Sequence, residues 1–471
     1  RQAADLLRYH AGWNFALNRP LGEAVFHPTT LVYFRDRLIE QGLSQLVFGK
    51  ILEALIAAGL VARQSKQRLD STQVLGLVRR MSRVDCVREA LRLALQELEQ
   101  RAQPFGRPQC WSRLWERYVE SKLDYQAGAD VLKSKLAEAG SDAAVLLAWV
   151  PSLSDPTIGA GEKITLLQRV LAEQFELVDP VTVQPRKELN SDRVQNPHEP
   201  EAHYSVKGQG AQKKEHVGYK VQVAETVTGQ KLAAGEPTAN FITGMVTHAA
   251  QESDLAGARQ MEAQQAAMGL EKPPVQYVDG AYVNGPTLAA AHAQGRELMG
   301  PAARAPHNNG GKFTTEDFQI TVEERKAICP AGQENTQCGR IENQQTGEVT
   351  YRFEWSRHCA GCALREQCVG AGQKHRSLVV TQHHTVLQAR RQEQQSESFG
   401  EEMKQRNAIE GTQSEMVRAH GLRRARYRGL AKVRLQNYFI GAACNAKRWI
   451  KRMVWEMKAH GASLEPALHT G

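Results

Sequence analysis

The chain has 471 residues, of which 41% are hydrophobic and 24% are charged, and its formal net charge is +9. This length is sufficient for a large core and for several domains. No apolar run reaches the length of a bilayer span and no signal-peptide pattern opens the chain, which excludes an integral membrane protein and favours a cytoplasmic one. Because the chain starts at Arg1 in an apparently helical region, we expect a further segment to precede it.

Residues 1–64 are expected to form a helical N-terminal domain. Apolar residues recur at helical spacing from Thr30 to Leu60, and Gly42 and Gly59 are placed to end two helices. Two short helices joined by a glycine-containing turn are also typical of a helix-turn-helix motif. The pattern favours a plain helical core.

A sheet is predicted to begin at residues 65–75, where a strand-like run contains Asp70. From 76 to 185 the apolar spacing is helical, which predicts a helical insertion after the first strand. The sheet is expected to resume within residues 186–305, where residues 216–224 alternate cleanly and two further strands follow. The last of these strands leads directly into Asp279.

Residues 306–384 are expected to form a separate module, since they contain five of the eight cysteines. In a cytoplasmic protein, clustered cysteines favour a metal over disulfides, and a two-residue gap lets two sulfurs reach one tetrahedral ion. The sequence therefore predicts a structural zinc ion, with reduced thiols as the alternative and with Cys338 and His358 as competing ligands. The four predicted ligands are Cys329, Cys359, Cys362 and Cys368, and the remaining cysteines are expected to be core residues.

The C-terminal part, residues 385–458, combines a long polar helix that contains Glu410 with a basic segment, and residues 459–471 form a tail. Between Arg418 and Lys458 the chain has twelve Lys or Arg residues and a single acid, a balance of +11. A basic helix face exposed to solvent would explain such a run, but phosphate binding explains it better beside Glu410. Interleaved aromatic residues either stack on unpaired bases or pack the helix onto the sheet: Tyr427, Tyr438 and Trp449.

Three acidic residues stand in contexts that suit a shared divalent-metal site: Asp70, Asp279 and Glu410. Mg²⁺ prefers hard oxygen ligands, and a few carboxylates together with substrate phosphate oxygens suffice to hold it. Carboxylates brought close together would repel one another without a cation or a proton between them. Taken singly, each of the three is more commonly a turn, capping or solvated residue.

The sequence around these acids resembles the DDE transposases of bacterial insertion sequences, in the segments 69–72, 278–282 and 409–412 and, most specifically, in 421–429. The resemblance implies an α/β fold with an RNase H-like mixed sheet, helical N-terminal and inserted domains and a small Cys-rich insertion. It implies metal-dependent cleavage at the element's terminal repeats and strand transfer into target DNA, by a homodimer on DNA.

On this resemblance, Asp70, Asp279 and Glu410 would be the catalytic triad and would hold two Mg²⁺ ions, which Mn²⁺ could replace. The expected DNA-binding residues are Arg406, Arg418, Arg423, Arg424, Arg426, Arg428, Lys432 and Arg434.

Two features depart from the family pattern. Relatives surround the catalytic Glu with Tyr, Arg and Lys; Arg406 fits this pattern, whereas Met403 and Val417 replace the Tyr and the Lys, and Arg418 follows one residue late. Acidic residues also crowd the segment 196–201, so Glu199 is an alternative first ligand. We prefer Asp70 because of its strand-like context.

Two other functions agree with the same sequence. A catalytically decayed or host-adopted DNA-binding protein would retain the basic helix and the Cys-rich module, although the intact triad argues against it. A DNA nuclease without strand transfer would need the same metal ligands. Inverted repeats flanking the reading frame would discriminate among these functions.

Overall fold

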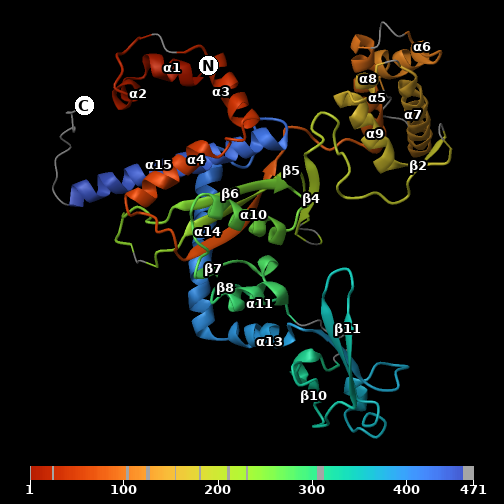
Figure 1. Ribbon diagram of the computed structural model, residues 1–471, viewed down its shortest axis with the longest axis vertical. Coiled ribbons are helices and arrows are strands. Elements are labelled where there is room, and N and C mark those ends of the chain that lie inside the picture. Colours follow the sequence, from red (N-terminus) through yellow and green to blue (C-terminus); the bar gives the residue numbers. More distant parts are fainter. Residues whose placement is uncertain are drawn as a thin grey trace.

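The computed structural model describes residues 2–23, 26–101, 106–122, 128–153, 155–179, 182–208, 210, 213–229, 232–304 and 312–459. The expected tail at 459–471 lies almost entirely outside these residues. The fold is mixed α/β, with one six-stranded sheet and helices packed around it (Figure 1). None of the described helices has the length and apolarity needed to cross a membrane.

The main sheet contains the strands that the sequence predicts around both aspartates. Its strand order is β4-β5-β1-β7-β8, with β6 also paired to β5. β1 is antiparallel to β5 and parallel to β7, and β7 is parallel to β8, so the sheet is mixed. The bounds are β1 Gln67–Leu75, β4 His203–Lys207, β5 Lys214–Thr226, β6 Ile242–Ala249, β7 Val275–Tyr277 and β8 Glu297–Met299.

Helices from distant parts of the chain cover this sheet. The N-terminal α4 and the C-terminal α15 pack against each other, and α15 also contacts β6. Buried apolar side chains, among them Phe48, Tyr219 and Met245, form the core between these elements. The helices are α3 Thr29–Glu40, α4 Leu46–Ala57, α10 Asp254–Ala267, α11 Gly285–Ala293, α13 His384–Glu393, α14 Glu397–His420 and α15 Leu430–Ala459.

The N-terminal helices end where the glycines predict. Gly42 and Gly59 follow α3 and α4 and adopt φ values of 68° and 70°, a left-handed conformation that favours glycine at a helix C-terminus. Two further helices, α1 Gln2–Tyr9 and α2 Ala11–Ala16, precede them. α4 contributes buried side chains to the sheet's core, which supports the interpretation of a helical core here.

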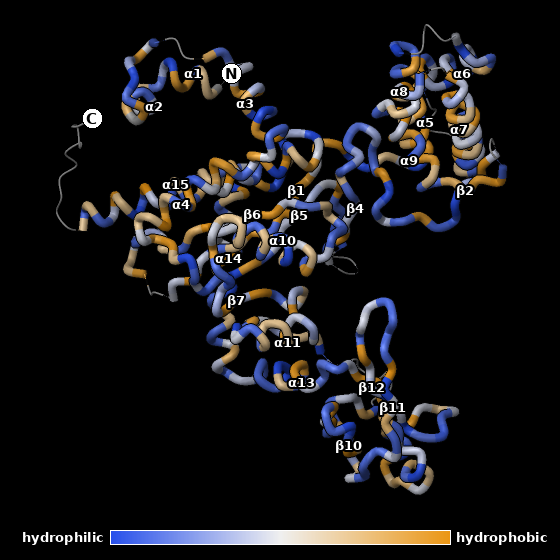
Figure 2. Tube along the Cα trace, in the orientation of Figure 1, coloured by the Kyte–Doolittle hydropathy of each residue, from blue (hydrophilic) through white to orange (hydrophobic). Residues whose placement is uncertain are grey.

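The chain after β1 forms a helical unit with its own hydrophobic core, which lies apart from the main sheet (Figure 1). Figure 2 shows that the segment leading back from this unit to the sheet is largely hydrophilic. Most of the elements between β1 and β4 are helices, and the assignment of 76–185 as an inserted domain stays a prediction. Its elements are α5 Arg83–Arg101, α6 Trp111–Trp115, a π-helix Glu116–Glu120, α7 Ala129–Trp149, a 3-10 helix Val150–Ser152, α8 Pro156–Gly159, α9 Glu162–Gln174, β2 Phe175–Leu177 and β3 Val183–Pro185.

The cysteine-rich segment also has a small core of its own, built around Phe318, Phe353 and Trp355. In Figure 1 it lies beyond α13, away from the main sheet. Its elements are a 3-10 helix Thr315–Asp317, β9 Gln319–Thr321, β10 Lys326–Ile328, β11 Gln337–Glu342, β12 Val349–Glu354, α12 Arg365–Cys368 and β13 Ser377–Thr381.

Candidate active site

Strand pairing brings the two aspartates together. In the parallel pair of β1 and β7, Gln67 lies opposite Gln276 and Arg68 opposite Tyr277. The same offset takes Asp70 to Asp279, just beyond the end of β7. Asp279 caps a 3-10 helix, where its carboxylate accepts a hydrogen bond from the backbone N–H of Ala281 at 2.9 Å. Both carboxylates are thus fixed where the parallel strands separate.

Helix α14 supplies the third acid and a shared cation. Arg406 and Glu410 are four residues apart and lie on the same face of this helix. Arg406 Nη2 lies 3.0 Å from Asp70 Oδ2 and 3.9 Å from Asp279 Oδ2, and Arg406 Nη1 lies 3.9 Å from Glu410 Oε1. The three predicted triad residues and Arg406 therefore meet at one place, although they lie on three elements.

The three carboxylates differ strongly in their exposure to solvent. The side chain of Asp70 is 12% exposed, that of Asp279 39% and that of Glu410 72%. Burial raises the pKa of Asp70, and Asp279 raises it further, while Arg406 and the backbone N–H of Ser71 lower it. Asp70 is thus a buried carboxylate whose ionised form requires a nearby positive charge.

The alternative first ligand, Glu199, has structural partners instead. Its buried carboxylate accepts hydrogen bonds from the Tyr219 hydroxyl at 2.9 Å and from the Leu77 backbone N–H at 3.0 Å. Glu201 accepts a hydrogen bond from the backbone N–H of Leu430, the first residue of α15. These contacts assign both residues to loop and helix-end stabilisation, and neither carboxylate forms a recorded ion pair with Arg406 among the described residues.

A buried polar network that the sequence did not reveal holds α14 in position. The carboxylate of Glu225 on β5 accepts hydrogen bonds from Arg68 at 2.7 Å and from the Thr412 hydroxyl at 2.7 Å. Arg448 of α15 also donates to Glu225, and it donates to Thr412 at 2.7 Å. Since Thr412 follows Glu410 by two residues, this network fixes the helix that presents Glu410. No local motif marks it, because its members lie far apart in the sequence.

The arginine-rich segment after α14 is a loop between two helices. Gly421 ends α14 in a left-handed conformation, and α15 begins at Leu430. The loop runs beside the end of β1, since Ala425 donates to the Leu75 carbonyl at 2.8 Å and Leu75 donates to the Arg423 carbonyl at 2.9 Å. The basic segment is therefore anchored next to the strand that contains Asp70.

The predicted DNA-binding side chains of this loop point outward. Leu422 and Ala425 are buried, whereas Arg423, Arg424, Arg426 and Arg428 are exposed. The Arg423 guanidinium donates to the Thr72 hydroxyl at 3.2 Å, two residues along β1 from Asp70. Within the described chain, no ion pair with a carboxylate is recorded for the loop arginines or for Arg418, Lys432 and Arg434.

Other members of the basic run, which were not among the predicted DNA-binding residues, form ion pairs with carboxylates. In α15, Lys447 and Arg448 pair with Glu415, and Arg452 pairs with Glu236 and Glu456. Two of the three aromatic residues pack in the core: Tyr438 is buried and stacks on Phe48, and Trp449 packs against the same cluster. The ring of Tyr427 lies under the Arg35 guanidinium.

The four predicted zinc ligands line one pocket together with Trp355 and His358. Burial raises the pKa of the Cys368 thiol, and the other three cysteines are among the neighbours that raise it. In the described part of the chain, however, the one group of three ligand atoms lying within 4.8 Å of one another is formed by Glu415, His420 and Cys444. The four cysteines thus share a cavity, but no three of their sulfurs lie this close to one another, and the same holds for the carboxylate oxygens of Asp70, Asp279 and Glu410.

The structure shows the environment of two positions that depart from the family pattern, 417 and 418. Val417 packs against the core of the sheet, so its position faces inward on α14. Arg418, the next residue, is exposed. An exposed basic side chain is therefore present at position 418 and not at position 417.

Comparison with known proteins gives one match. The model of a family described as "Transposase DDE domain" matches residues 328–450. This segment contains the four cysteines, Arg406, Glu410 and the arginine-rich loop, but neither Asp70 nor Asp279. No curated protein matches the chain. The match supports the resemblance of this chain to the DDE transposases.

Proposed function

We propose that the protein is a transposase that cleaves DNA at the ends of an insertion sequence and joins the freed 3′-hydroxyl to target DNA. The observation that carries this proposal is the meeting of Asp70, Asp279 and Glu410 around Arg406. A transposase DDE domain implies a DNA substrate and a phosphodiester as the reacting group. Carboxylates are the side chains that hold the metal ions in metal-dependent phosphodiester cleavage, and here three of them come together from separate elements.

The donor set suits divalent metal ions. All three side chains offer carboxylate oxygens, the ligand type that Mg²⁺ and Mn²⁺ prefer. Asp279 and Glu410 are open to solvent, so water and a phosphate group could complete a coordination sphere. When bound, two such ions would supply Lewis acidity at the phosphate and a nucleophile of lowered pKa. We assign both ions to Asp70, Asp279 and Glu410.

The protein's own residues position the substrate. Arg406 lies among all three carboxylates, so its guanidinium is available to a phosphate oxygen that enters the site. Arg423 lies along β1 from Asp70, and the other loop arginines extend the positive charge away from the site. This arrangement supports a DNA path along the end of β1.

The fold supports the same assignment. The strand order β6-β5-β1-β7-β8, antiparallel in its first half and parallel in its second, fits the mixed sheet expected of an RNase H-like core. We therefore propose a catalytic core assembled from 65–75, 186–305 and 385–458, interrupted by the helical insertion at 76–185 and the module at 306–384, and preceded by the helices of 1–64. Because both element ends must be cut and joined together, we propose that two copies act on DNA.

The test replaces Glu410, the most exposed of the three acids. Glu410→Gln should reduce Mg²⁺-dependent cleavage of an end fragment by about 100-fold or more, since loss of an outer-shell metal partner alone costs 10- to 100-fold. Binding of the fragment should persist, because the change removes no positive charge. Glu401→Gln is the matched control: Glu401 lies on the same helix, is 70% exposed and pairs with Lys404. Equal cleavage by both variants would exclude the proposed role of Glu410.

A further inference from the structure

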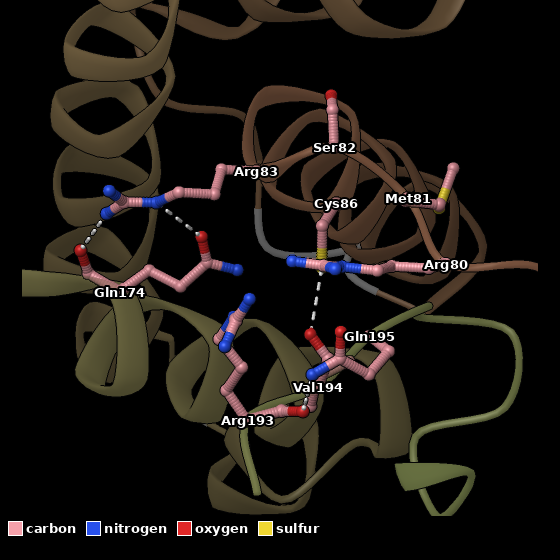
Figure 3. Close-up of a pocket in the computed structure, with 9 residues that line it drawn as sticks. All are labelled: Arg80, Met81, Ser82, Arg83, Cys86, Gln174, Arg193, Val194 and Gln195. Carbon is pink, nitrogen blue, oxygen red and sulfur yellow. Dashed lines mark hydrogen bonds between the residues drawn. The ribbon is translucent and has the colours of Figure 1, made fainter. Parts of the chain in front are cut away.

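A second concentration of positive charge lies away from the candidate active site, where the chain passes between the sheet and the helical unit. A cavity of about 270 Å³ is bounded by the segment that enters α5, by the end of α9 and by the segment that returns to the sheet. Figure 3 shows side chains from all three segments around it. Its lining includes Arg80, Arg83 and Arg193 and no acidic residue.

Two of these arginines are held by neutral acceptors. Arg83 donates to the Gln174 carbonyl at 2.9 Å and to the Arg186 carbonyl at 3.2 Å. Arg193 donates to the Asn190 carbonyl at 3.0 Å. Over the described ranges, neither has a recorded ion pair with a carboxylate. Their positive charge is therefore positioned but not neutralised by a direct partner.

The third arginine is only weakly compensated. Arg80 lies 3.5 Å from the exposed Glu215 and stacks over the Tyr204 ring. Burial lowers the pKa of Arg83, and the charge of Arg193 lowers it further. Burial likewise lowers the pKa of Arg193, and the charge of Arg80 lowers it further. The guanidinium groups thus repel one another in a partly buried space. A bound anion would reduce this repulsion.

The nearby acids are engaged with other groups. Glu173 pairs with Arg169 at 2.7 Å and accepts a hydrogen bond from the Val194 backbone N–H. Asp85 accepts a hydrogen bond from the Ser82 hydroxyl at 2.6 Å. The cavity also lies at the N-terminus of the 19-residue helix α5, whose dipole adds positive potential there.

We propose that this arginine pocket binds one phosphate group of the DNA backbone, an inference that rests on the proposed action on DNA. Arg80 follows Asp70 by ten residues, through β1 itself. An extended chain of that length spans at most about 36 Å, which a duplex covers in about ten base pairs. The contacted phosphate should therefore lie within about one helical turn of the cleaved bond.

The first measurement is the salt dependence of end-fragment binding by the full chain. Arg193→Ala should reduce the slope of log affinity against log salt by about 0.9, the effect of one lost phosphate contact on B-DNA. Arg193→Lys, which keeps the charge, should restore most of the slope. The control is Lys133→Ala in the same helical unit, an 80% exposed lysine paired with Asp130, which should leave the slope unchanged.

The second measurement locates the phosphate. In an end fragment with single neutral methylphosphonates placed along the first ten base pairs, one position should weaken binding by the wild-type protein but have no further effect on Arg193→Ala. A position that weakens both proteins equally belongs to another contact. If no position couples to Arg193, the inference is wrong, even where the fragment binds normally and Mg²⁺-dependent cleavage supports the proposed function.

A third measurement separates DNA from a free anion. If inorganic phosphate at millimolar concentration raises the melting temperature of the wild type but not of Arg193→Ala, while the salt slopes for DNA are equal, the pocket holds a small anion and the DNA assignment is overturned. Normal cooperative melting of Arg193→Ala without phosphate establishes that the variant is folded. The DNA assignment requires both the slope change and the methylphosphonate coupling.

Discussion

The guanidinium of Arg406 lies 3.0 Å from the carboxylate of Asp70, although the two residues are 336 positions apart. The contact joins the central strand β1 to helix α14, and a hydrogen bond from Arg68 to the Gln405 carbonyl at 3.0 Å joins the same two elements. Because Glu410 follows Arg406 by one helical turn, these contacts determine where the third acid lies relative to the two aspartates.

The buried network around Glu225 predicts a large cost for breaking it. Arg448→Met removes a charge that pairs with Glu225 and leaves that carboxylate buried with fewer partners. Loss of one member of a buried ion pair costs about 3–5 kcal/mol. The free energy of unfolding from urea titration should fall by this amount, whereas Lys451→Met, at an exposed position of the same helix, should change it by less than about 0.5 kcal/mol. Equal stabilities would contradict the positioning role.

The arginine-rich loop predicts a steep salt dependence of DNA binding. Replacing Arg424, Arg426 and Arg428 by Ala should flatten the slope of log affinity against log salt by about two to three, if all three neutralise backbone phosphates. On a helix these three residues could not share one narrow face, but in the observed loop all three are exposed. The slope is measured by titrating an end fragment at several salt concentrations.

A matched triple variant controls for total charge. Lys50→Ala, Lys133→Ala and Lys135→Ala remove three exposed charges from other helices and should leave the slope as in the wild type. If the arginine variant also keeps the wild-type slope, these arginines serve folding or protein contacts.

The cysteine pocket predicts one zinc ion per chain. Metal analysis of the purified protein should find about one equivalent, as expected for a four-ligand structural site. Cys362→Ser should lower both the zinc content and the melting temperature. Cys338→Ser should keep the zinc, since Cys338 lies on β11 and does not line the pocket. Protein free of zinc would indicate reduced thiols instead.

The raised pKa of Asp70 predicts a pH effect on stability in metal-free protein. Between the ordinary aspartate pKa of 3.8 and the raised value, the folded protein binds more protons at this site than the unfolded chain does. The contribution of Asp70 to the free energy of unfolding therefore falls as pH rises through this window. As pH rises from 4 to 7 in EDTA, Asp70→Asn should therefore gain stability relative to the wild type. A difference that is constant or changes in the opposite direction would contradict the burial argument.

The sequence predicted those parts of the fold that local patterns encode. Alternation predicted β5 and β7, strand-like runs predicted β1 and β6, and glycines predicted the ends of α3 and α4. The preference for Asp70 over Glu199 stays a prediction, although Asp70 contacts Arg406 whereas Glu199 is held by Tyr219. Counting charges could not separate Lys447 and Arg448, which pair with Glu415, from the arginines without such partners, because this pairing depends on how α15 packs against α14.

No local pattern in the sequence predicted the arginine pocket either. Arg83 and Arg193 are 110 positions apart, and only the return of the chain from the helical unit brings them together. The same holds for Asp70 and Asp279, whose proximity follows from the parallel pairing of β1 with β7. Long-range pairing of this kind leaves no signature in local composition.

The cleavage rate of Asp279→Asn on an end fragment in Mg²⁺ tests the central assignment most directly. Asn can accept the same helix-capping hydrogen bond as Asp279, so the fold should be unaffected, while the metal loses a charged ligand. We predict a fall in the rate of about 100-fold or more with fragment binding nearly intact. Cleavage at the wild-type rate would contradict the assignment of Asp70, Asp279 and Glu410 as one metal site.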